Sequence, residues 1–276
     1  MISTDRISTS TNLLCFKRGG RREMVTSIPL IASYGYRNID LNFCELMNPG
    51  HHIDDAYIAR LKEYRKEYGL TYNQSHVPYT ADYLGLGAEE RLSLDALIRK
   101  AFIHSAELGV DTVVIHPVKG SIKDNISYMK ERLSELPSPC RLAVENMERE
   151  DEISTAEDLI EIVDALGPRA GVCLDTGHAH MRGLDIGKMI GKLGQRLIAT
   201  HIADNHGKSD EHFMPYFGTI PWEDVTAALN AVDYQGFLTY EIMFFMRYVP
   251  EELQDDVGRL SYRVLEHLTS QTNSAS

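Results

Sequence analysis

Side chains that can bind a metal ion stand at or near the ends of six apolar, strand-like segments of this 276-residue chain. The segments are YNQSH, TVVIH, LAVE, VCLD, LIATHIAD and LTYE, and their metal-binding residues are His76, His116, Glu145, Asp175, His201 and Glu241. Glu145 and Glu241 are each the lone charge after an apolar run, where burial without a partner costs several kcal/mol. A metal ion is a natural partner for carboxylates placed in this way.

The mixture of carboxylates and imidazoles indicates which metal ions would fit. Such a set suits Mn²⁺, Zn²⁺, Co²⁺ or Fe²⁺ better than Ca²⁺ or Mg²⁺, which prefer oxygen ligands. We therefore expect a divalent metal cofactor, Mn²⁺ or Zn²⁺ first, with Co²⁺, Fe²⁺ or Mg²⁺ as alternatives. A single carboxylate at a strand end more often caps a helix, and a single histidine there is usually only hydrogen-bonded. The hypothesis depends on all six positions together.

Three more candidates lie in predicted loops after the same strands. His178 belongs to LDTGHAHM, and Asp210 and His212 form a D-x-H pair in KSDEHF. Additional metal ions could be held by a wider set, namely His76, His116, His178, Asp210 and His212. Other histidines fall inside predicted helices or in the loop before one, and we expect structural or solvated roles for them: His51, His52, His104 and His267.

The elements that must position these residues alternate along the chain. The predicted strands cover residues 6–10, 38–43, 70–78, 110–117, 141–146, 170–175, 197–204 and 236–243. The predicted helices cover residues 21–35, 54–68, 92–109, 121–136, 154–167, 185–193, 221–232 and a closing segment whose apolar face is Leu253, Val257, Leu260, Val264 and Leu268. The strands are short, apolar and β-branched rather than alternating, as parallel strands covered on both faces should be.

This alternation predicts an α/β fold, a single (β/α)8 TIM barrel over residues 1–276 with a frayed tail from about residue 270. An open doubly wound sheet is the alternative, but the chain has neither G-x-G-x-x-G after its first strand nor G-x-x-x-x-G-K-[ST]. In a barrel, the carboxyl ends of all strands meet at one mouth only about ten ångströms across. The six strand-end residues would then share one site.

Composition excludes several partners. The formal charge is −12, from 40 acidic and 28 basic residues, and no basic cluster resembles a footprint for nucleic acid. No apolar run is long enough for a membrane span, and the first residues contain no signal-peptide core. The cysteines Cys15, Cys44, Cys140 and Cys173 are scattered and form no C-x-x-C pair, which favours reduced thiols. We expect a cytoplasmic protein.

Several motifs in order resemble the xylose isomerase-like barrel superfamily, which includes tagatose/psicose 3-epimerases, hydroxypyruvate isomerases, inosose-processing enzymes and endonuclease IV. They are HVPY, VVIHP, AVENM, LDTGHAHM, HIADNHGKSDEHFMPYFGTIPW and YEIM. By resemblance to the epimerases, the metal ligands would be Glu145, Asp175, His201 and Glu241. His178 would contact the substrate, together with His116 and His76.

The resemblance implies a metal-dependent isomerase or epimerase acting on a sugar, a sugar phosphate or a keto acid. Glu145 and Glu241 would exchange a proton next to the carbonyl, through an enediolate. The expected partner is a small-molecule carbohydrate, and barrels of this kind frequently form homo-oligomers. A non-catalytic carbohydrate-binding barrel is a further alternative.

Endonuclease IV, a zinc phosphodiesterase acting on abasic DNA, is the competing branch. All nine of its ligand positions are matched in type here, by His76, His116, Glu145, Asp175, His178, His201, Asp210, His212 and Glu241. Three departures argue against it: ENMERED lacks the small-residue run of that branch, HPVKGS lacks its H-P-G, and the chain is acidic.

The sequence also departs from the free-ketose epimerases, which have an arginine where this chain has Gly207. A phosphate or carboxylate on the substrate could be contacted by basic residues beyond the strand ends, although each is more often a solvated charge: Lys119, Arg182, Lys208 and Arg247. Trp222 and the run MFFM at 243–246 could form apolar walls of the pocket.

Overall fold

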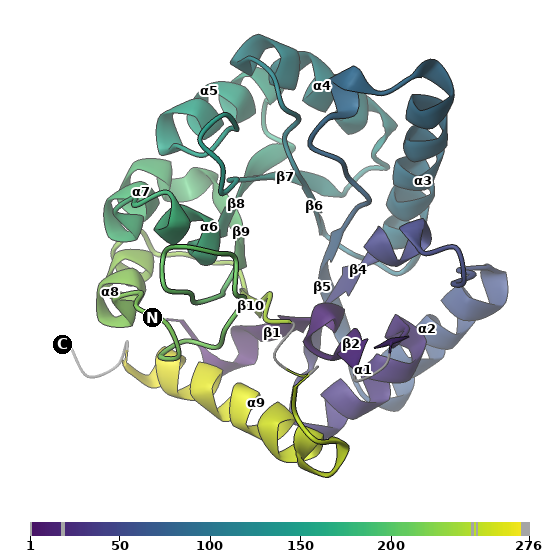
Figure 1. The fold of residues 1–276 in the computed structure, drawn as a ribbon, viewed down its shortest axis with the longest axis vertical. Coiled ribbons are helices and arrows are strands. Elements are labelled where there is room, and N and C mark those ends of the chain that lie inside the picture. Colours follow the sequence, from purple (N-terminus) through teal and green to yellow (C-terminus); the bar gives the residue numbers. More distant parts are fainter. Residues whose placement is uncertain (1, 18–19, 244–245, 247, 272–276) are drawn as a thin grey trace.

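Eight parallel strands form a nearly closed barrel in the computed structural model, which describes residues 2–17, 20–243, 246 and 248–271 (Figure 1). The strands are β1 (Ile7–Ser10), β4 (Asn38–Asn42), β5 (Thr71–His76), β6 (Thr112–Ile115), β7 (Arg141–Glu145), β8 (Ala170–Asp175), β9 (Leu197–His201) and β10 (Leu238–Tyr240). They pair in the order β10-β1-β4-β5-β6-β7-β8-β9. A parallel bridge between Ile202 and Tyr240 closes the ring next to β9.

Helices surround the barrel and complete the predicted (β/α)8 fold (Figure 1). They are α1 (Met24–Ser33), α2 (Asp55–Glu67), α3 (Ala88–Glu107), α4 (Ile122–Glu135), α5 (Ala156–Leu166), α7 (Ile186–Leu193), α8 (Trp222–Ala231) and α9 (Gln254–Gln271). No helix in the described part of the chain is both long and apolar enough to cross a membrane. The strand order and the surrounding helices confirm the single TIM barrel predicted from the alternating pattern. The proposed frayed tail falls mostly on residues 272–276, outside the described residues.

Local sequence signals explain where the helices begin and end. The Asp54 carboxylate accepts a hydrogen bond from the Tyr57 N–H at the start of α2, and Ser121 caps α4 in the same way. Gly69 and Gly109, with φ of +63° and +72°, adopt the left-handed conformation just after α2 and α3. Helix α3 begins earlier than predicted because Glu90 accepts from the Gly87 N–H and closes its first turn.

The apolar face predicted for the closing helix α9 is displaced by about one residue. Leu253 and Leu260 are 47% and 41% exposed. The residues turned inward are Gln254, Gly258, Ser261, Leu265 and Leu268. The reason is the pair of small residues, because a Cβ at Gly258 would lie 2.3 Å from the Tyr34 ring and the Ser261 hydroxyl bonds to Tyr36. Tyr34 and Tyr36 thus contact small residues of α9, where the predicted face would have turned Leu253 and Leu260 inward.

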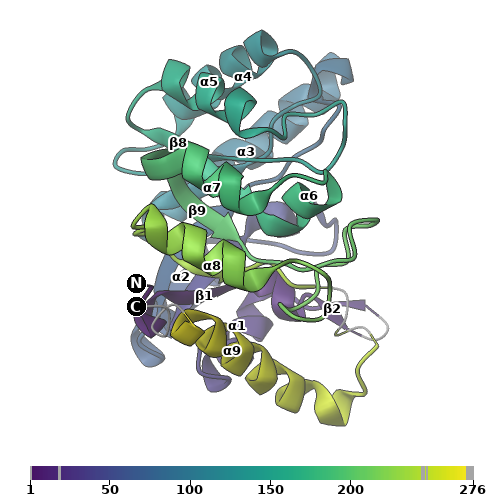
Figure 2. The ribbon, with the colours of Figure 1, turned by 90° about the vertical axis from the view of Figure 1, so that its left-hand side faces the viewer.

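Two small elements at the barrel mouth were not predicted. One is the hairpin of β2 (Phe16–Lys17) and β3 (Gly20–Arg21), and the other is α6 (Thr176–Met181), which contains His178. Figure 2 shows α6 and β2 at the same end of the barrel. This end carries the carboxyl termini of the strands, where the candidate ligands lie.

Polar side chains fill part of the barrel interior beneath this mouth. The Ser8 hydroxyl donates to Asn73 at 2.7 Å, and Asn73 in turn donates to the Thr239 hydroxyl at 3.3 Å. Thr239 then donates to Gln74 at 3.2 Å, and Gln74 donates to Asp40 at 3.4 Å. All five residues are buried, so their polar atoms depend on one another for hydrogen bonds.

Candidate metal centre

Four strand ends bring the proposed metal ligands together. Glu145, Asp175 and His201 are the last residues of β7, β8 and β9, and Glu241 directly follows β10. Their potential ligand atoms all lie within 4.8 Å of one another. Glu145, Asp175 and His201 are fully buried, and Glu241 is 8% exposed. Residues separated by almost 100 positions in sequence thus meet because parallel strands of one barrel end at one mouth.

His201 lies at the middle of this group. Its Nδ1 is 3.1 Å from Glu145 Oε1 and 3.2 Å from Glu241 Oε2. Its other ring nitrogen, Nε2, faces Asp40 Oδ2 at 3.5 Å. One oxygen of Asp175 accepts the His178 backbone N–H at 2.7 Å, while Oδ2 is buried without a hydrogen-bond partner among the described residues. A buried carboxylate oxygen without a hydrogen-bond partner is unfavourable, so this atom is a candidate metal ligand.

The charges of the group also favour a cation. Burial raises the pKa of Asp175 to about 7, and the carboxylates of Glu145 and Glu241 add to this rise. Burial acts in the same direction on Glu241, but the neighbouring His201 prevails and lowers the pKa of Glu241 to about 2. Three carboxylates and one imidazole in so small a volume are a donor set that fits a divalent metal ion.

A second potential ligand group shares Glu145. His76 and His116 lie with Glu145 in a set whose ligand atoms are within 4.8 Å of one another. Both histidines follow the prediction, since His76 ends β5 and His116 comes just after β6. Their Nε2 atoms are 3.4 and 3.2 Å from Glu145 Oε2.

The loop candidates form a third cluster beside the first two. Asp210 Oδ2 lies 3.6 Å from His178 Nε2 and 2.5 Å from His212 Nε2. Burial disfavours the charged form of His212, but Asp210 prevails and raises the pKa of His212 to about 9. All nine residues predicted as candidates therefore lie around one mouth.

Asn146, the residue after Glu145, holds two of the candidates in place. Its side-chain amide donates to the Asp175 carbonyl at 2.9 Å and accepts the Asp175 N–H at 2.8 Å. Its backbone carbonyl lies 2.8 Å from His178 Nδ1. This contact occupies Nδ1 and leaves Nε2 of His178 to face Asp210.

A buried carboxylate organises the loop that carries Asp210 and His212. Asp204 accepts four hydrogen bonds: from the backbone N–H groups of Asn205, Tyr216 and Ile220 and from the Trp222 indole. Trp222 was predicted to form a wall of the pocket, and this prediction was wrong, because its ring is buried beside Asp204 and does not line the cavity. Met243 does line it, whereas Phe244 and Phe245 lie outside the described residues.

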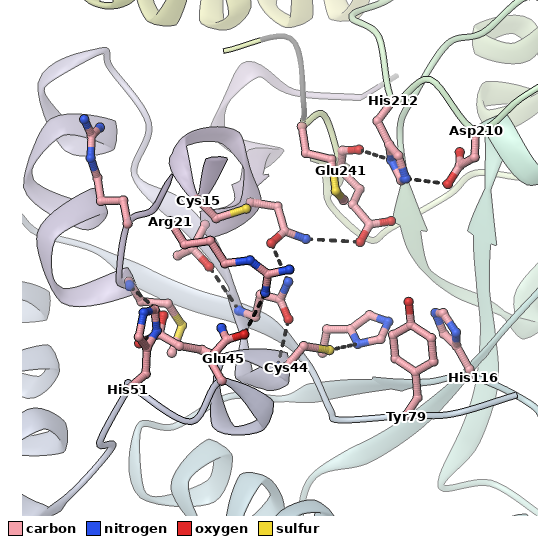
Figure 3. Close-up of a pocket in the computed structure, with 18 of the residues that line it drawn as sticks. Cys15, Arg21, Cys44, Glu45, His51, Tyr79, His116, Asp210, His212 and Glu241 are labelled. Atoms are coloured by element: carbon pink, nitrogen blue, oxygen red, sulfur yellow. Dashed lines mark hydrogen bonds and ion pairs between the residues drawn. The ribbon is translucent and has the colours of Figure 1, made fainter. Parts of the chain in front are cut away.

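A cavity of about 290 Å³ opens next to these clusters (Figure 3). One side is lined by His76, His116, His178, Asp210, His212 and Glu241. The other side comes from the first 51 residues and includes Asn12, Arg21, Arg22, Asn42, Glu45 and His51. His51 was expected to be structural or solvated, but it lines the cavity with its Nδ1 3.5 Å from Glu45. No sequence signal identified this second side, because its residues do not end apolar strands.

Three of the four basic residues considered as phosphate contacts do not line the cavity. Lys119 pairs with Asp151 at 2.5 Å, and Arg182 donates to the Ser154 hydroxyl. Neither these two nor Lys208 is among the described residues that line the cavity, and Arg247 lies outside the described part of the chain.

The fold and the strand-end site now define the class of protein. The family model described as "Xylose isomerase-like TIM barrel" matches residues 28–256. The chain belongs to this family.

Individual relatives include both epimerases and uncharacterised proteins. The D-psicose 3-epimerase of Enterocloster bolteae is 24% identical over 203 residues, which are 67% of this chain and 65% of that protein. An uncharacterised protein of Sinorhizobium fredii is 28% identical over 172 residues, 55% of this chain, and the match spans only 53% of that relative's length.

Solved structures share the fold over nearly the whole chain. A D-tagatose 3-epimerase-like protein superposes with a TM-score of 0.78 at 22% identity, covering 97% of this chain and 98% of the other. The D-psicose 3-epimerase of Clostridium cellulolyticum H10 with D-tagatose gives 0.76 at 16% identity, covering 97% and 99%. At these identities the likeness shows the fold.

Proposed function

We propose that the protein is a divalent-metal-dependent isomerase or epimerase that acts on a carbohydrate. The observation that carries this proposal is the buried group of Glu145, Asp175, His201 and Glu241, with ligand atoms within 4.8 Å at the mouth of the barrel. Metal ligands from four different strand ends at this mouth are typical of TIM-barrel active sites. The similarity to proteins named as psicose and tagatose 3-epimerases supports the choice of a sugar as substrate.

The reaction requires that a proton be removed from a carbon next to a carbonyl and returned there or to the neighbouring atom. In this proposal Glu145 and Glu241 are the proton carriers, since they reach the centre from strands on either side of β8 and β9. A bound divalent ion supplies Lewis-acid stabilisation of the negative charge that develops during this transfer. His178, with His76 and His116, donates hydrogen bonds to substrate oxygens and fixes their orientation.

The test combines metal analysis with proton exchange. The purified protein is analysed for metal content and then incubated with ketoses in deuterated water, beside Glu145→Gln, Glu241→Gln and the exposed control Glu150→Gln. We expect about one divalent ion per chain and deuterium in the sugar, with both lost or strongly reduced in the two site variants only. If the protein takes up no metal and labels no sugar, the proposal fails and a non-catalytic carbohydrate-binding barrel takes its place.

A second function is favoured by one observation, the additional clusters around His76, His116 and Glu145 and around Asp210. They match the ligand pattern of the zinc phosphodiesterase branch, which uses several metal ions on abasic DNA. The charge of −12 argues against DNA as a partner. Cleavage of an abasic-site duplex, with more than one metal per chain and no deuterium in any sugar, would establish this second function instead.

A further inference from the structure

Two arginines line the side of the cavity away from the candidate metal ligands, and they indicate a class of substrate. We propose that Arg21 and Arg22 bind an oxyanion on the substrate, a phosphate ester or a carboxylate, at the side of the cavity away from the metal ligands. The inference rests on the proposed function, because it concerns the substrate of the same site. Both arginines line the cavity together with the candidate metal-binding side chains.

The hairpin fixes the position of the two arginines. Arg21 pairs with Phe16 in the β2–β3 ladder, and the Arg22 N–H donates to the Cys15 carbonyl at 2.7 Å. The Arg21 guanidinium also donates to the side-chain oxygen of Asn48 at 2.7 Å. This bond orients the guanidinium.

Figure 3 shows how the charged groups are distributed across the cavity. The Arg21 side chain extends between Cys15 and Glu45 toward the middle of the lining residues, while Asp210 and Glu241 lie on the far side. A substrate with one anionic end is attracted at that end by the guanidinium groups. Its carbonyl and hydroxyl groups would thus face the metal ligands.

Glu45 is the acidic residue on the arginine side, and the protein itself occupies both of its oxygens. Oε1 accepts the Tyr57 hydroxyl hydrogen at 2.7 Å, and Oε2 accepts the Met24 N–H at 2.8 Å. The residue is only 7% exposed. These bonds tie the segment after β4 to α2 and to the start of α1, which begins two residues after Arg22, so Glu45 holds the arginine side together.

Two amides on the arginine side suit the uncharged part of such a substrate. Asn12 donates to Glu241 Oε1 at 3.4 Å, and Asn42 bonds to the Asn12 side chain. Both line the cavity and can exchange hydrogen bonds with sugar hydroxyls. A planar guanidinium matches two oxygens of a phosphate or carboxylate at once, which a lysine cannot do.

The first experiment measures binding without catalysis. Inorganic phosphate is titrated calorimetrically into the metal-loaded protein, into the double variant Arg21→Gln/Arg22→Gln and into a control, Arg149→Gln/Arg263→Gln, which removes the same charge from exposed surface positions. We expect phosphate affinity to fall about tenfold or more in the first variant and to remain within about twofold in the control. Equal phosphate affinity in all three proteins, including undetectable binding, would overturn the proposal.

The second experiment distinguishes the two sources of the oxyanion and separates this inference from the proposed function. Deuterium exchange is compared for a ketose, its phosphate ester and the corresponding keto acid. We expect the arginine variant to raise the KM of one anionic substrate about tenfold or more relative to the KM of the neutral ketose, and to leave the metal content unchanged. An unchanged KM for both anions contradicts the inference, whereas absence of metal and of all exchange contradicts the proposed function.

Discussion

Asp40 and His201 face each other inside the barrel, with Asp40 Oδ2 3.5 Å from His201 Nε2. Asp40 is 1% exposed and His201 is fully buried. Because Nδ1 of the same ring points at Glu145 and Glu241, Asp40 favours the tautomer that carries its hydrogen on Nε2 and keeps the Nδ1 lone pair directed at the candidate metal centre. The buried chain of polar side chains from Ser8 to Gln74 holds Asp40 in this position.

Replacement of Asp40 by asparagine tests this arrangement. Asp40→Asn keeps the shape but removes the charge, and we expect the affinity for Co²⁺ or Zn²⁺ to fall about 10- to 100-fold while the fold is retained. Titration of the metal-free protein, with the Co²⁺ absorption spectrum as a second readout, measures the change. Asp111→Asn, an exposed carboxylate just before β6, is the control and should bind normally. Wild-type affinity and an unchanged spectrum in Asp40→Asn would show that Asp40 has no influence on the metal centre.

Metal binding should strengthen with pH, because Asp175 must lose its proton to act as a ligand. With its pKa raised to about 7 by burial and the neighbouring carboxylates, Asp175 is mostly protonated at pH 6 and mostly charged at pH 8. Protons therefore compete with the metal at the lower pH, and the apparent affinity should rise about tenfold between these values. Calorimetric titration at both pH values measures it, and a flat profile would be inconsistent with a raised pKa.

The Asp204 carboxylate should be needed for the loop that carries Asp210 and His212. Asp204→Asn places an amide N–H₂ group where two of the four donors now meet an oxygen, so buried donors lose their acceptor. We expect the free energy of unfolding to fall by about 3 kcal/mol. Urea denaturation measures this change against Asp224→Asn, an exposed residue in α8 that should cost less than about 1 kcal/mol. Equal losses of unfolding free energy in the two variants would show that the hydrogen bonds accepted by Asp204 do not stabilise the loop.

Two glycines offer a matched test of the same loop. A Cβ at Gly218 would lie 2.3 Å from Asp204 Oδ1, whereas a Cβ at Gly191, within α7, has open space around it. Gly218→Ala should therefore lower stability by about 1–3 kcal/mol, since the loop backbone must move. Gly191→Ala should raise stability by up to about 1 kcal/mol through its helix propensity. Thermal unfolding of both variants checks the opposite signs.

The strand ends were predictable because they combine two independent signals. A short apolar run predicts a buried parallel strand, and a polar residue directly after it, as with Glu145 and Asp175, falls at the mouth of any barrel of this class. Six of the nine candidate residues were found in this way, and His178, Asp210 and His212 came from the loops that follow the same strands. The structure gathers all nine around one mouth. Their roles as ligands and proton carriers stay predictions.

Other parts of the site gave no comparable signal. Asp40 lies inside its strand, where only the three-dimensional neighbour His201 explains a buried carboxylate. Arg21 belongs to a strand of two residues, too short to produce a periodic pattern. His51 lines the cavity because of how the loop after β4 folds, which depends on Glu45 and its long-range partner Tyr57. Such contacts are set by tertiary packing, which local patterns do not encode.

Under the proposed function and the proposed arginine contacts, choice of substrate and chemistry are carried by different stretches of the chain. The cavity residues before position 52 supply none of the four side chains in the central ligand group, which all come from positions 145–241. On these proposals, exchange of the β2–β3 hairpin, which lies outside that stretch, should alter which molecule is bound without changing the candidate ligand group. A library for directed evolution can therefore be limited to a short, contiguous N-terminal segment. Natural variation in the same segment would change the substrate in the same way.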